Sequence, residues 1–479
     1  MHFLIAFTVM AIVAVAITAV AKRHARRLQR SRRIHIDRFK LKRRHAEIEL
    51  EVFGSRDVVH AIQAYAKENH VAVDVAMKKA HQYLTEIVPK FNLLAYYRFG
   101  APIARALLYF LYRVAVERKP LHDLDAKAPK GTVVVYIINH RSNADYLLVA
   151  HLLFKFISLS YAVGEWARVW PLNHLFKWFG GYFVRRRYRE PLYHAILSRF
   201  VQTITRRGVT QGIFLEGGLS RDGAFQKPKL GMLDYIVGSK RDPEFTAPLL
   251  LIPTAINYDR VLEDRNLTDE LRGKEDRAGR LEKLSTTSEF LFKNALRSVV
   301  RRFKRYGYAV VTFGTPLSVD EFIRQHPGLL AEKFEERKPE LVRLAETIME
   351  RISDALPMTP VTLVAHIFAA NSSASELAEE RIVDQIERLQ KEWVDRPWLL
   401  RERAAIDIWR AAREVLLLRH LIEVVVGGWR WNPAELTLRD YYANSLLTYG
   451  EVKQRGWPVR GSRSEAVGET RNQKPETGK

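Results

Sequence analysis

The chain has 479 residues, of which 47% are hydrophobic and 27% are charged. These are the proportions of a globular protein, so they exclude disorder along the whole chain. The length suffices for two or three domains. The chain contains no cysteine, which excludes disulfides, thiolate zinc sites and a cysteine nucleophile. Its formal net charge of +23 favours an anionic partner: nucleic acid, a membrane surface or a phosphorylated substrate.

An apolar stretch early in the sequence is followed by a dense basic run. Residues 3–21 are nineteen uncharged, mostly apolar residues, and as a helix they would span roughly 28 Å, about the thickness of a bilayer core. Residues 22–44 carry twelve Lys or Arg and one acidic residue. A cleaved signal peptide is the alternative, but basic residues just after a cleavage site oppose translocation. We therefore predict a transmembrane anchor at 1–21 and a basic juxtamembrane segment at 22–50, which contacts anionic phospholipids on the cytoplasmic side.

Apolar residues at helical spacing follow this basic segment. Val58, Ile62 and Tyr65 recur at intervals of three and four residues, after Ser55, a residue type suited to an N-cap. Further helices are expected at 73–87 and 107–116. We therefore expect a helical N-terminal region over 51–126.

From about residue 127 the pattern changes to short β-branched runs that alternate with helical stretches. The expected strands lie at 132–138, 180–186, 212–217, 248–258 and 308–314. This alternation predicts an α/β domain over 127–320, in which helices flank a mixed, largely parallel sheet. The pattern is helical again over 321–450, which we assign to a C-terminal region. The tail at 461–479 has little apolar surface to bury and is expected to be disordered.

The residues with the clearest chemical potential follow the first expected strand. His140 and Asp145 stand five residues apart where the strand gives way to a helix. A histidine beside a carboxylate supplies a general base and the group that fixes its tautomer. Helix capping is the alternative, because Asn143 and Asp145 are both residue types that favour helix N-termini. On this stretch alone, both interpretations stay open.

Polar residues also follow the later strands, where ligands bind in open α/β sheets. The set comprises Arg185, Arg186, Arg187, Arg189, Glu216, Gly217, Gly218, Ser220, Arg221, Lys227 and Lys229. Several cations beside glycine-exposed backbone amides favour a phosphate site. The sequence lacks the GxSxG, GxxxxGK[ST], HExxH and GxGxxG motifs, so hydrolase, nucleotide and metal interpretations have no motif to support them.

Four segments together resemble the HX4D glycerolipid acyltransferases, in particular the membrane glycerol-3-phosphate and dihydroxyacetone-phosphate acyltransferases. The sequence HRSNAD at 140–145 is similar to the family's HX4D block in its HRSxxDY form. The remaining blocks follow in the family's order: GGYFVRR at 180–186, FLEGGLSR at 214–221 with PKLG at 228–231, and LIPTAINYD at 251–259. The resemblance covers roughly residues 90–375.

The resemblance implies transfer of a fatty acyl group from a thioester, acyl-CoA or acyl-ACP, to a phosphorylated polyol. In that reaction His140 would deprotonate the acceptor hydroxyl and Asp145 would orient the imidazole. Pro253 would belong to the acyl-donor side. The implied acceptor site comprises Arg141, Ser142, Arg186, Glu216, Gly217, Ser220, Arg221 and Lys229. Neither a metal nor a bound cofactor is expected.

One position departs from the family pattern. Leu219 stands where the third block usually has its first arginine, and loss of a planar, bidentate donor would weaken recognition of a phosphate. Arg221 could suffice or Arg187 could substitute, and otherwise the acceptor is a different one.

The resemblance therefore predicts a glycerol-3-phosphate 1-O-acyltransferase of phospholipid synthesis, anchored in the cell inner membrane. Its expected partners are membrane phospholipids, the acyl donor and the phosphorylated acceptor. Dihydroxyacetone phosphate and a lysophospholipid are alternative acceptors. A basic membrane- or nucleic-acid-binding protein is the alternative from another class. Nucleic acid is not expected, because single-strand binding needs basic residues interleaved with stacking aromatics, whereas the cations here cluster in the basic segment and at presumed strand ends.

Overall fold

The computed structural model describes residues 45–88, 101–117, 128–152, 160–163, 181–183, 185, 188, 190–271, 305–372, 376–397, 399–400 and 402–457. The expected anchor at 1–21, most of the basic segment at 22–50 and the tail at 461–479 lie outside these residues. Within the described ranges, no helix combines the length and the apolar character needed to cross a membrane.

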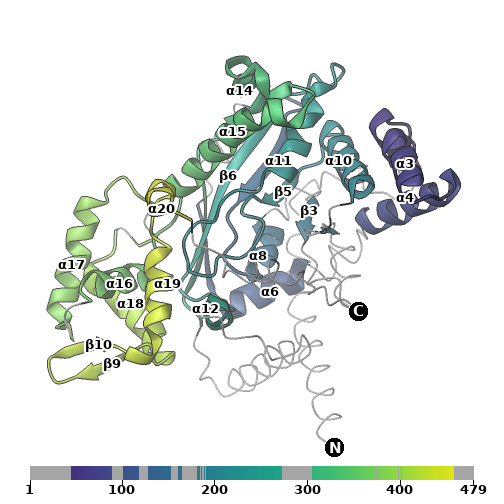
Figure 1. The fold of residues 1–479 in the computed structure, drawn as a ribbon. Helices are drawn as coiled ribbons and strands as arrows, with labels where there is room; N and C mark the ends of the chain where they lie inside the picture. Colours follow the sequence, from purple (N-terminus) through teal and green to yellow (C-terminus); the bar gives the residue numbers. More distant parts are fainter. Residues whose placement is uncertain are drawn as a thin grey trace, which may run out of the picture.

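One eight-stranded sheet lies at the centre of the fold (Figure 1). Its strands are β1 (Arg113–Val116), β2 (Val133–Ile138), β3 (Ser160–Val163), β4 (Gly181–Phe183), β5 (Gln211–Phe214), β6 (Leu249–Tyr258), β7 (Tyr308–Phe313) and β8 (Leu317–Ser318). The strand order is β1-β7-β6-β2-β5-β3-β4, and β8 pairs with β6. Strands β2 to β6 are mutually parallel, whereas β7 and β8 run antiparallel to β6. The prediction of a mixed, largely parallel sheet is confirmed.

The two central strands are apolar almost throughout because both faces of the sheet are covered. Strand β2 reads VVVYII and β6 reads LLLIPTAINY, and nearly every residue of both is buried. Near-continuous β-branched and aliphatic runs of this kind are typical of parallel strands packed on both sides.

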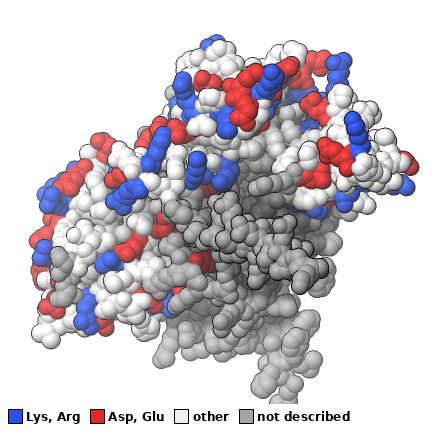
Figure 2. Space-filling model, in the orientation of Figure 1, with Lys and Arg blue, Asp and Glu red and all other residues white. Residues whose placement is uncertain are grey.

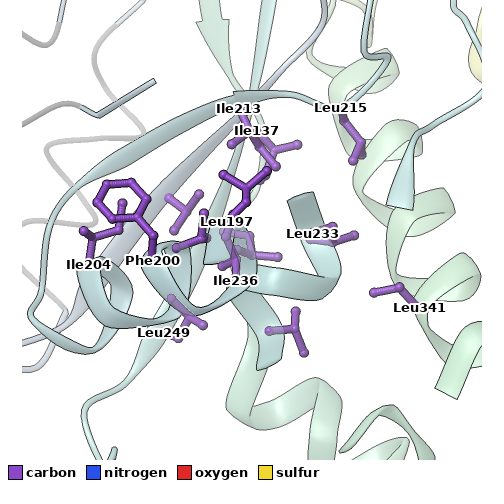
Figure 3. Packing of buried hydrophobic residues seen from close by; sticks show 14 of the residues in the cluster. Ile137, Leu197, Phe200, Ile204, Ile213, Leu215, Leu233, Ile236, Leu249 and Leu341 are labelled. Carbon is purple, nitrogen blue, oxygen red and sulfur yellow. The ribbon is translucent and has the colours of Figure 1, made fainter. Parts of the chain in front are cut away.

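Helices α10 (Pro191–Arg206), α11 (Leu230–Val237) and α15 (Phe334–Asp354) cover one face of the sheet (Figure 1). Figure 3 shows their apolar side chains meeting those of the strands, with Leu197 and Phe200 of α10 near Ile137 of β2 and Ile213 of β5. The N-terminal helices α2 (His45–Phe53), α3 (Arg56–Glu68) and α4 (Val73–Ile87) pack in turn against α10.

The other face is shared by α6 (Ala101–Leu111), α8 (Ala144–Leu152) and a C-terminal group of helices at the left of Figure 1. That group contains α16 (Pro360–Ala370), α17 (Glu379–Glu392), α18 (Ala405–Leu418) and α19 (Leu436–Asn444), whereas α20 (Tyr449–Arg455) packs against α15 of the first face. One apolar cluster joins Tyr136 and Ile256 of the sheet to Val364 of α16 and Trp409 of α18. The C-terminal helices and the sheet therefore have a common core. The shorter helices α12 (Asp264–Leu271) and α14 (Val319–Gln325) follow β6 and β8.

Two local expectations were wrong. The stretch 107–116, expected to be one helix, divides into the end of α6 and strand β1, which pairs with β7. The C-terminal region also contains a hairpin, β9 (Ile422–Val425) and β10 (Gly428–Trp431), within a stretch expected to be helical. Its β-branched residues and Gly-Gly turn are a strand signal that outweighed the helical neighbours.

Acidic and basic residues are interspersed on the face shown in Figure 2. Many of them pair on exposed helix surfaces, such as Arg388 with Glu392 in α17 and Lys338 with Glu335 in α15. Exposed pairs of this kind contribute little to stability because water and salt screen them.

Candidate active site

The loop between β2 and α8 brings the expected histidine and aspartate together. His140 Nδ1 lies 2.9 Å from Asp145 Oδ2, and both side chains are buried. The contact is possible because Asp145 occupies the first turn of α8, so that the chain folds back toward the end of β2. Their catalytic roles stay predictions, but the geometry that a base and its orienting carboxylate require is present.

Four donors converge on the carboxylate of Asp145. Its Oδ2 faces the ring of His140 and accepts the backbone N–H groups of Arg141 at 2.8 Å and Ser142 at 3.0 Å. Its Oδ1 accepts the hydroxyl of Tyr258 at 2.6 Å. Because a carboxylate only accepts hydrogen bonds, these donors satisfy it and fix its plane. These two N–H groups belong to the loop before α8. Asp145 therefore fixes the β2–α8 loop and does not cap the helix.

The imidazole of His140 is held by aromatic rings. It stacks on Phe214, the last residue of β5, with ring centroids 4.1 Å apart, and meets the edge of Tyr146 at 5.5 Å. The contact with Asp145 favours the tautomer that carries its proton on Nδ1. The basic nitrogen of the ring is then Nε2.

Glu216 connects the β2–α8 loop to the segment that follows β5. Its Oε1 accepts the backbone N–H of His140 at 3.0 Å, and its Oε2 accepts that of Gln226 at 2.7 Å. The side chain is 2% exposed, and burial raises the pKa of its carboxyl to about 7. Both oxygens hold backbone groups, so Glu216 shapes the site by fixing two loops.

Arg141 is a buried cation next to His140 and Asp145, which together are called the dyad below. Its guanidinium lies 5.2 Å from the ring centroid of Phe225, and Nη1 donates to the carbonyl of Gly223. Its Nε and Nη2 are buried and have no hydrogen-bond partner among the described residues. Buried polar groups are normally paired, so these two nitrogens mark a place where an anion would be stabilised.

Ser142 is held by a second carboxyl, that of the half-buried Glu263. Its Oγ donates to Glu263 Oε2 at 2.8 Å and accepts the backbone N–H of Ala144 at 3.1 Å. Burial raises the pKa of Glu263 to about 7, and the negative charge of Asp145 adds to the increase. The hydroxyl of Ser142 therefore supports the loop.

Two family models match the chain over this fold. The model described as "Acyltransferase" matches residues 121–256, which include the dyad, Arg141 and Glu216. The model described as "Glycerol-3-phosphate acyltransferase C-terminal region" matches residues 292–449. Both matches support the resemblance of this chain to the glycerolipid acyltransferases. An acyltransferase domain is thus present, as the four sequence blocks indicated.

Curated relatives of this chain are named glycerol-3-phosphate acyltransferase. That of Aeromonas hydrophila is 29% identical over 324 residues, 66% of this chain and 38% of the relative. That of Haemophilus influenzae (strain PittEE) is 26% identical over 355 residues, 71% of this chain and 41% of the relative. That of Xanthomonas campestris is 28% identical over 401 residues, 79% of this chain and 43% of the relative. The chain therefore spans about two fifths of the length of these relatives.

A solved structure also aligns with this chain. It is the 1-acyl-sn-glycerophosphate acyltransferase of Thermotoga maritima, at 17% identity and a TM-score of 0.28, with 65% of this chain and 98% of that chain covered. A score this low does not establish a common fold.

The third sequence block, FLEGGLSR at 214–221, forms a tight loop after β5. Gly217 has a φ of +67°, and a Cβ there would lie 2.8 Å from Cγ of Lys229, so only glycine fits this crossing without strain. Lys229 is itself exposed, and its backbone N–H donates to the carbonyl of Leu215 at 2.8 Å. The hydroxyl of Ser220 donates to the carbonyl of Ala224 at 2.7 Å. Gly217 and Ser220 thus determine the shape of the loop.

Arg221 of that block binds a carboxylate of α12. Arg221 Nε donates to Glu270 Oε2 of α12 at 2.8 Å, and the arginine side chain is 39% exposed. Leu219 is half-buried and packs against the apolar cluster of the sheet and the C-terminal helices. Among the expected acceptor cations that are described, only Arg141 lies buried beside His140.

The second block meets the N-terminal helices. Arg186 lies outside the described residues. Arg185 donates from Nε and Nη2 to the two carboxylate oxygens of Glu86 in α4, at 2.9 and 2.5 Å. Three aromatic rings surround its guanidinium, those of Tyr83, Tyr188 and Tyr193. The first arginine of this block therefore binds the protein's own N-terminal region.

Pro253 of the fourth block is buried inside β6, opposite Ile137 of β2. It falls between the stretches where β6 pairs with β8 (250–251) and with β7 (254–258). The missing N–H of proline therefore breaks no ladder hydrogen bond, which explains how a central strand accommodates it. Its assignment to the acyl-donor side stays a prediction.

Two residues at the dyad received no role from the sequence, Tyr258 and Glu263. Tyr258 is the last residue of β6 and Glu263 follows five residues later. Polar residues at the end of an α/β strand are a recognised site signal, so the same rule that selected His140 and Glu216 would have selected them.

Proposed function

We propose that the chain transfers an acyl group from a thioester to a hydroxyl of glycerol 3-phosphate. The observation that carries the proposal is the buried contact of 2.9 Å between His140 Nδ1 and Asp145 Oδ2 at the end of β2. The name of the relatives, glycerol-3-phosphate acyltransferase, supports the choice of acceptor. The sn-1 hydroxyl is the proposed position of transfer.

In the proposed mechanism, His140 acts first as a base and then as an acid. Nε2 takes the proton of the acceptor hydroxyl while its oxygen forms a bond to the thioester carbonyl carbon. The tetrahedral intermediate then collapses, the C–S bond breaks, and the imidazolium gives its proton to the departing thiolate. Asp145 stabilises the imidazolium between the two steps, and general-base assistance of this kind contributes about 10²–10⁴ in rate.

Arg141 is the proposed ligand of the acceptor phosphate. Nε and Nη2, the two nitrogens without partners, form the side of a guanidinium that pairs bidentately with an oxyanion. The site is buried, so water does not screen the pair. A phosphate there would lie beside His140, because Arg141 is the next residue along the chain.

The acyl donor and the location are proposals that rest on the sequence. An acyl-CoA or acyl-ACP would enter as co-substrate, with no bound cofactor. The apolar residues 1–21 and the basic segment 22–50 would keep the site next to the phospholipids of the inner membrane, where the lipid product is used.

The experiment is an acyl-transfer assay on the full chain in detergent. Acyl-CoA and acyl-ACP are each tested with glycerol 3-phosphate, dihydroxyacetone phosphate and lysophosphatidate, and the acylated position is determined by product analysis. We expect lysophosphatidate from glycerol 3-phosphate, and loss of product in His140→Ala. The matched control is His194→Ala, because His194 lies in α10 and bonds to Tyr235 and Tyr188. Failure to acylate any acceptor, or full activity of His140→Ala, overturns the proposal.

A further inference from the structure

The carboxylate of Asp145 has a partner on the side away from His140. Tyr258 Oη donates to Asp145 Oδ1 at 2.6 Å, and the tyrosine side chain is fully buried. Burial and the charge of Asp145 raise the pKa of this phenol well above its usual value, so the hydroxyl keeps its proton and acts as the donor. Tyr258 ends β6, whereas His140 lies on the β2–α8 loop and Asp145 in the first turn of α8.

The ring of Tyr258 is fixed by its neighbours. Its centroid lies 5.4 Å from that of Tyr112, whose hydroxyl donates to the backbone carbonyl of Arg260 at 2.8 Å. The hydroxyl of Tyr258 therefore has little freedom to follow a moving carboxylate. A rigid donor on Oδ1 restricts rotation of the Asp145 carboxylate about its Cβ–Cγ bond, and so holds Oδ2 toward Nδ1.

We infer that Tyr258 is a positioning residue of acyl transfer, which holds Asp145 in the orientation that His140 requires. The inference rests on the proposed function, because it concerns the same dyad. Tyr258 does not contact the reacting atoms; it acts through Asp145. A misplacement of the imidazole by a fraction of an ångström is costly because proton transfer needs close alignment with the hydroxyl.

The segment that carries Tyr258 is fastened to the C-terminal helices. Asn257 Nδ2 donates to the carbonyl of Pro357 at 2.9 Å. Asp259 Oδ1 accepts the backbone N–H of Val361, in the first turn of α16, at 2.9 Å. These bonds lie on either side of Tyr258, so the C-terminal region determines where its hydroxyl lies.

A buried ion pair fastens the same segment further along. Asp264, at the start of α12, accepts a hydrogen bond from Arg419 Nη2 at 2.9 Å, and its Oδ2 lies 2.7 Å from Nη1 of the same arginine. Tyr442 of α19 also donates to Asp264, and it accepts from Arg419 at 2.9 Å. Both members of the ion pair are at least nine-tenths buried. The proposed role of Tyr258 therefore connects the C-terminal helices to the catalytic carboxylate.

The test compares Tyr258→Phe with Tyr112→Phe. Each variant removes one buried hydroxyl from the same aromatic group, but only the first removes a bond to Asp145. We expect Tyr258→Phe to lower kcat by about ten-fold or more, with KM for glycerol 3-phosphate within about two-fold of the wild-type value. Tyr112→Phe is expected to keep kcat within about two-fold.

The pH profile separates positioning from general destabilisation. With one donor fewer, the Asp145 carboxylate stabilises the imidazolium more strongly, so the acid limb of kcat/KM moves to higher pH in Tyr258→Phe. Other titratable or charged groups near His140 and Asp145 include Arg141, Tyr146, Glu216 and Glu263, and they are unchanged in both variants. Tyr112→Phe is expected to keep the wild-type limb.

The outcomes are distinguishable from those of the proposed function. An inactive wild type contradicts the proposed function itself. An active wild type with equal kcat and equal pH profiles in the two variants overturns the role of Tyr258. Arg419→Lys is the second variant, should Tyr258→Phe not fold: it keeps the charge but loses the paired contact with Asp264. It is expected to lower kcat with little change in KM, and an unchanged kcat contradicts the inference.

Discussion

Asp145 Oδ2 lies 2.9 Å from His140 Nδ1 and accepts, on the same oxygen, the backbone N–H groups of Arg141 and Ser142. One carboxylate thus shapes the loop and orients the imidazole that the loop carries. Removal of the charge of Asp145 is therefore expected to affect both the loop and the imidazole, although the rings of Phe214 and Tyr146 still contact His140.

Asp145→Asn is expected to lower kcat by about 10³–10⁴, because an amide cannot stabilise the imidazolium and favours the wrong tautomer. Steady-state kinetics with glycerol 3-phosphate measure the effect. Asp242→Asn is the control. Asp242 lies before β6, at the amino-terminal ends of the parallel strands, and pairs with Arg206. A loss of kcat below ten-fold in Asp145→Asn would count against the dyad.

The members of the dyad were predictable because they are close in sequence. Asp145 is the fifth residue after His140, and a single turn after an apolar strand brings them together. Tyr258 was not predictable in this way, since it lies 113 residues beyond Asp145. Its contact depends on β6 pairing beside β2, and local periodicity carries no information about which strands are neighbours.

The arginines of the second block show the converse limit. Sequence composition grouped Arg185 with the phosphate cations, but its guanidinium binds Glu86, 99 residues earlier in the chain. A run of arginines does not reveal which of them has an internal carboxylate partner. The family resemblance identified the blocks, whereas the division of roles within each block required the contacts.

Arg141→Met is expected to raise KM for glycerol 3-phosphate by about ten-fold to one-hundred-fold, because a charge-assisted, bidentate pair contributes roughly 1.5–3 kcal/mol. The KM of the acyl donor should stay the same. Arg221→Met tests the competing site, since Arg221 pairs with Glu270. A larger increase of KM in Arg221→Met than in Arg141→Met would assign the phosphate to Arg221.

Glu216→Gln is expected to weaken the pH dependence of folding. Burial raises the pKa of Glu216 to about 7, so the native state holds a proton that the unfolded state has lost between about pH 4.5 and 7. This contribution to stability is complete below about pH 4.5 and is lost as the pH rises through 7, and a shift of this size corresponds to roughly 3 kcal/mol. Urea unfolding at pH 5 and pH 8 measures the difference.

In the wild type, Glu216 contributes to a decrease in unfolding free energy from pH 5 to pH 8, and the glutamine variant should decrease less. Glu335→Gln is the matched control, because the Glu335 side chain is exposed on α15. Equal pH dependence in wild type and Glu216→Gln would contradict the assignment of a buried, protonatable carboxyl.

Leu219→Arg restores the residue type that the family usually has. Leu219 packs against the apolar cluster of the sheet and the C-terminal helices, so the substitution is expected to lower the unfolding free energy by about 1–3 kcal/mol. KM for the acceptor should not fall, since Arg141 already supplies the proposed phosphate contact. Leu219→Met is the control, with a similar volume and no charge. A several-fold lower acceptor KM in Leu219→Arg would show that position 219 faces the phosphate.

Arg185→Lys tests whether the second block is tied to the N-terminal helices. Lysine keeps the charge but loses the paired contact with Glu86 and the stacking on tyrosine rings. Because water partly screens the pair, the unfolding free energy should fall by only about 1–2 kcal/mol. A double-mutant cycle with Glu86→Gln isolates the coupling. Arg388→Lys is the control, because its pair with Glu392 is exposed and its loss should not be measurable. Equal changes in the two lysine variants, or no coupling in the cycle, would contradict a structural role for Arg185.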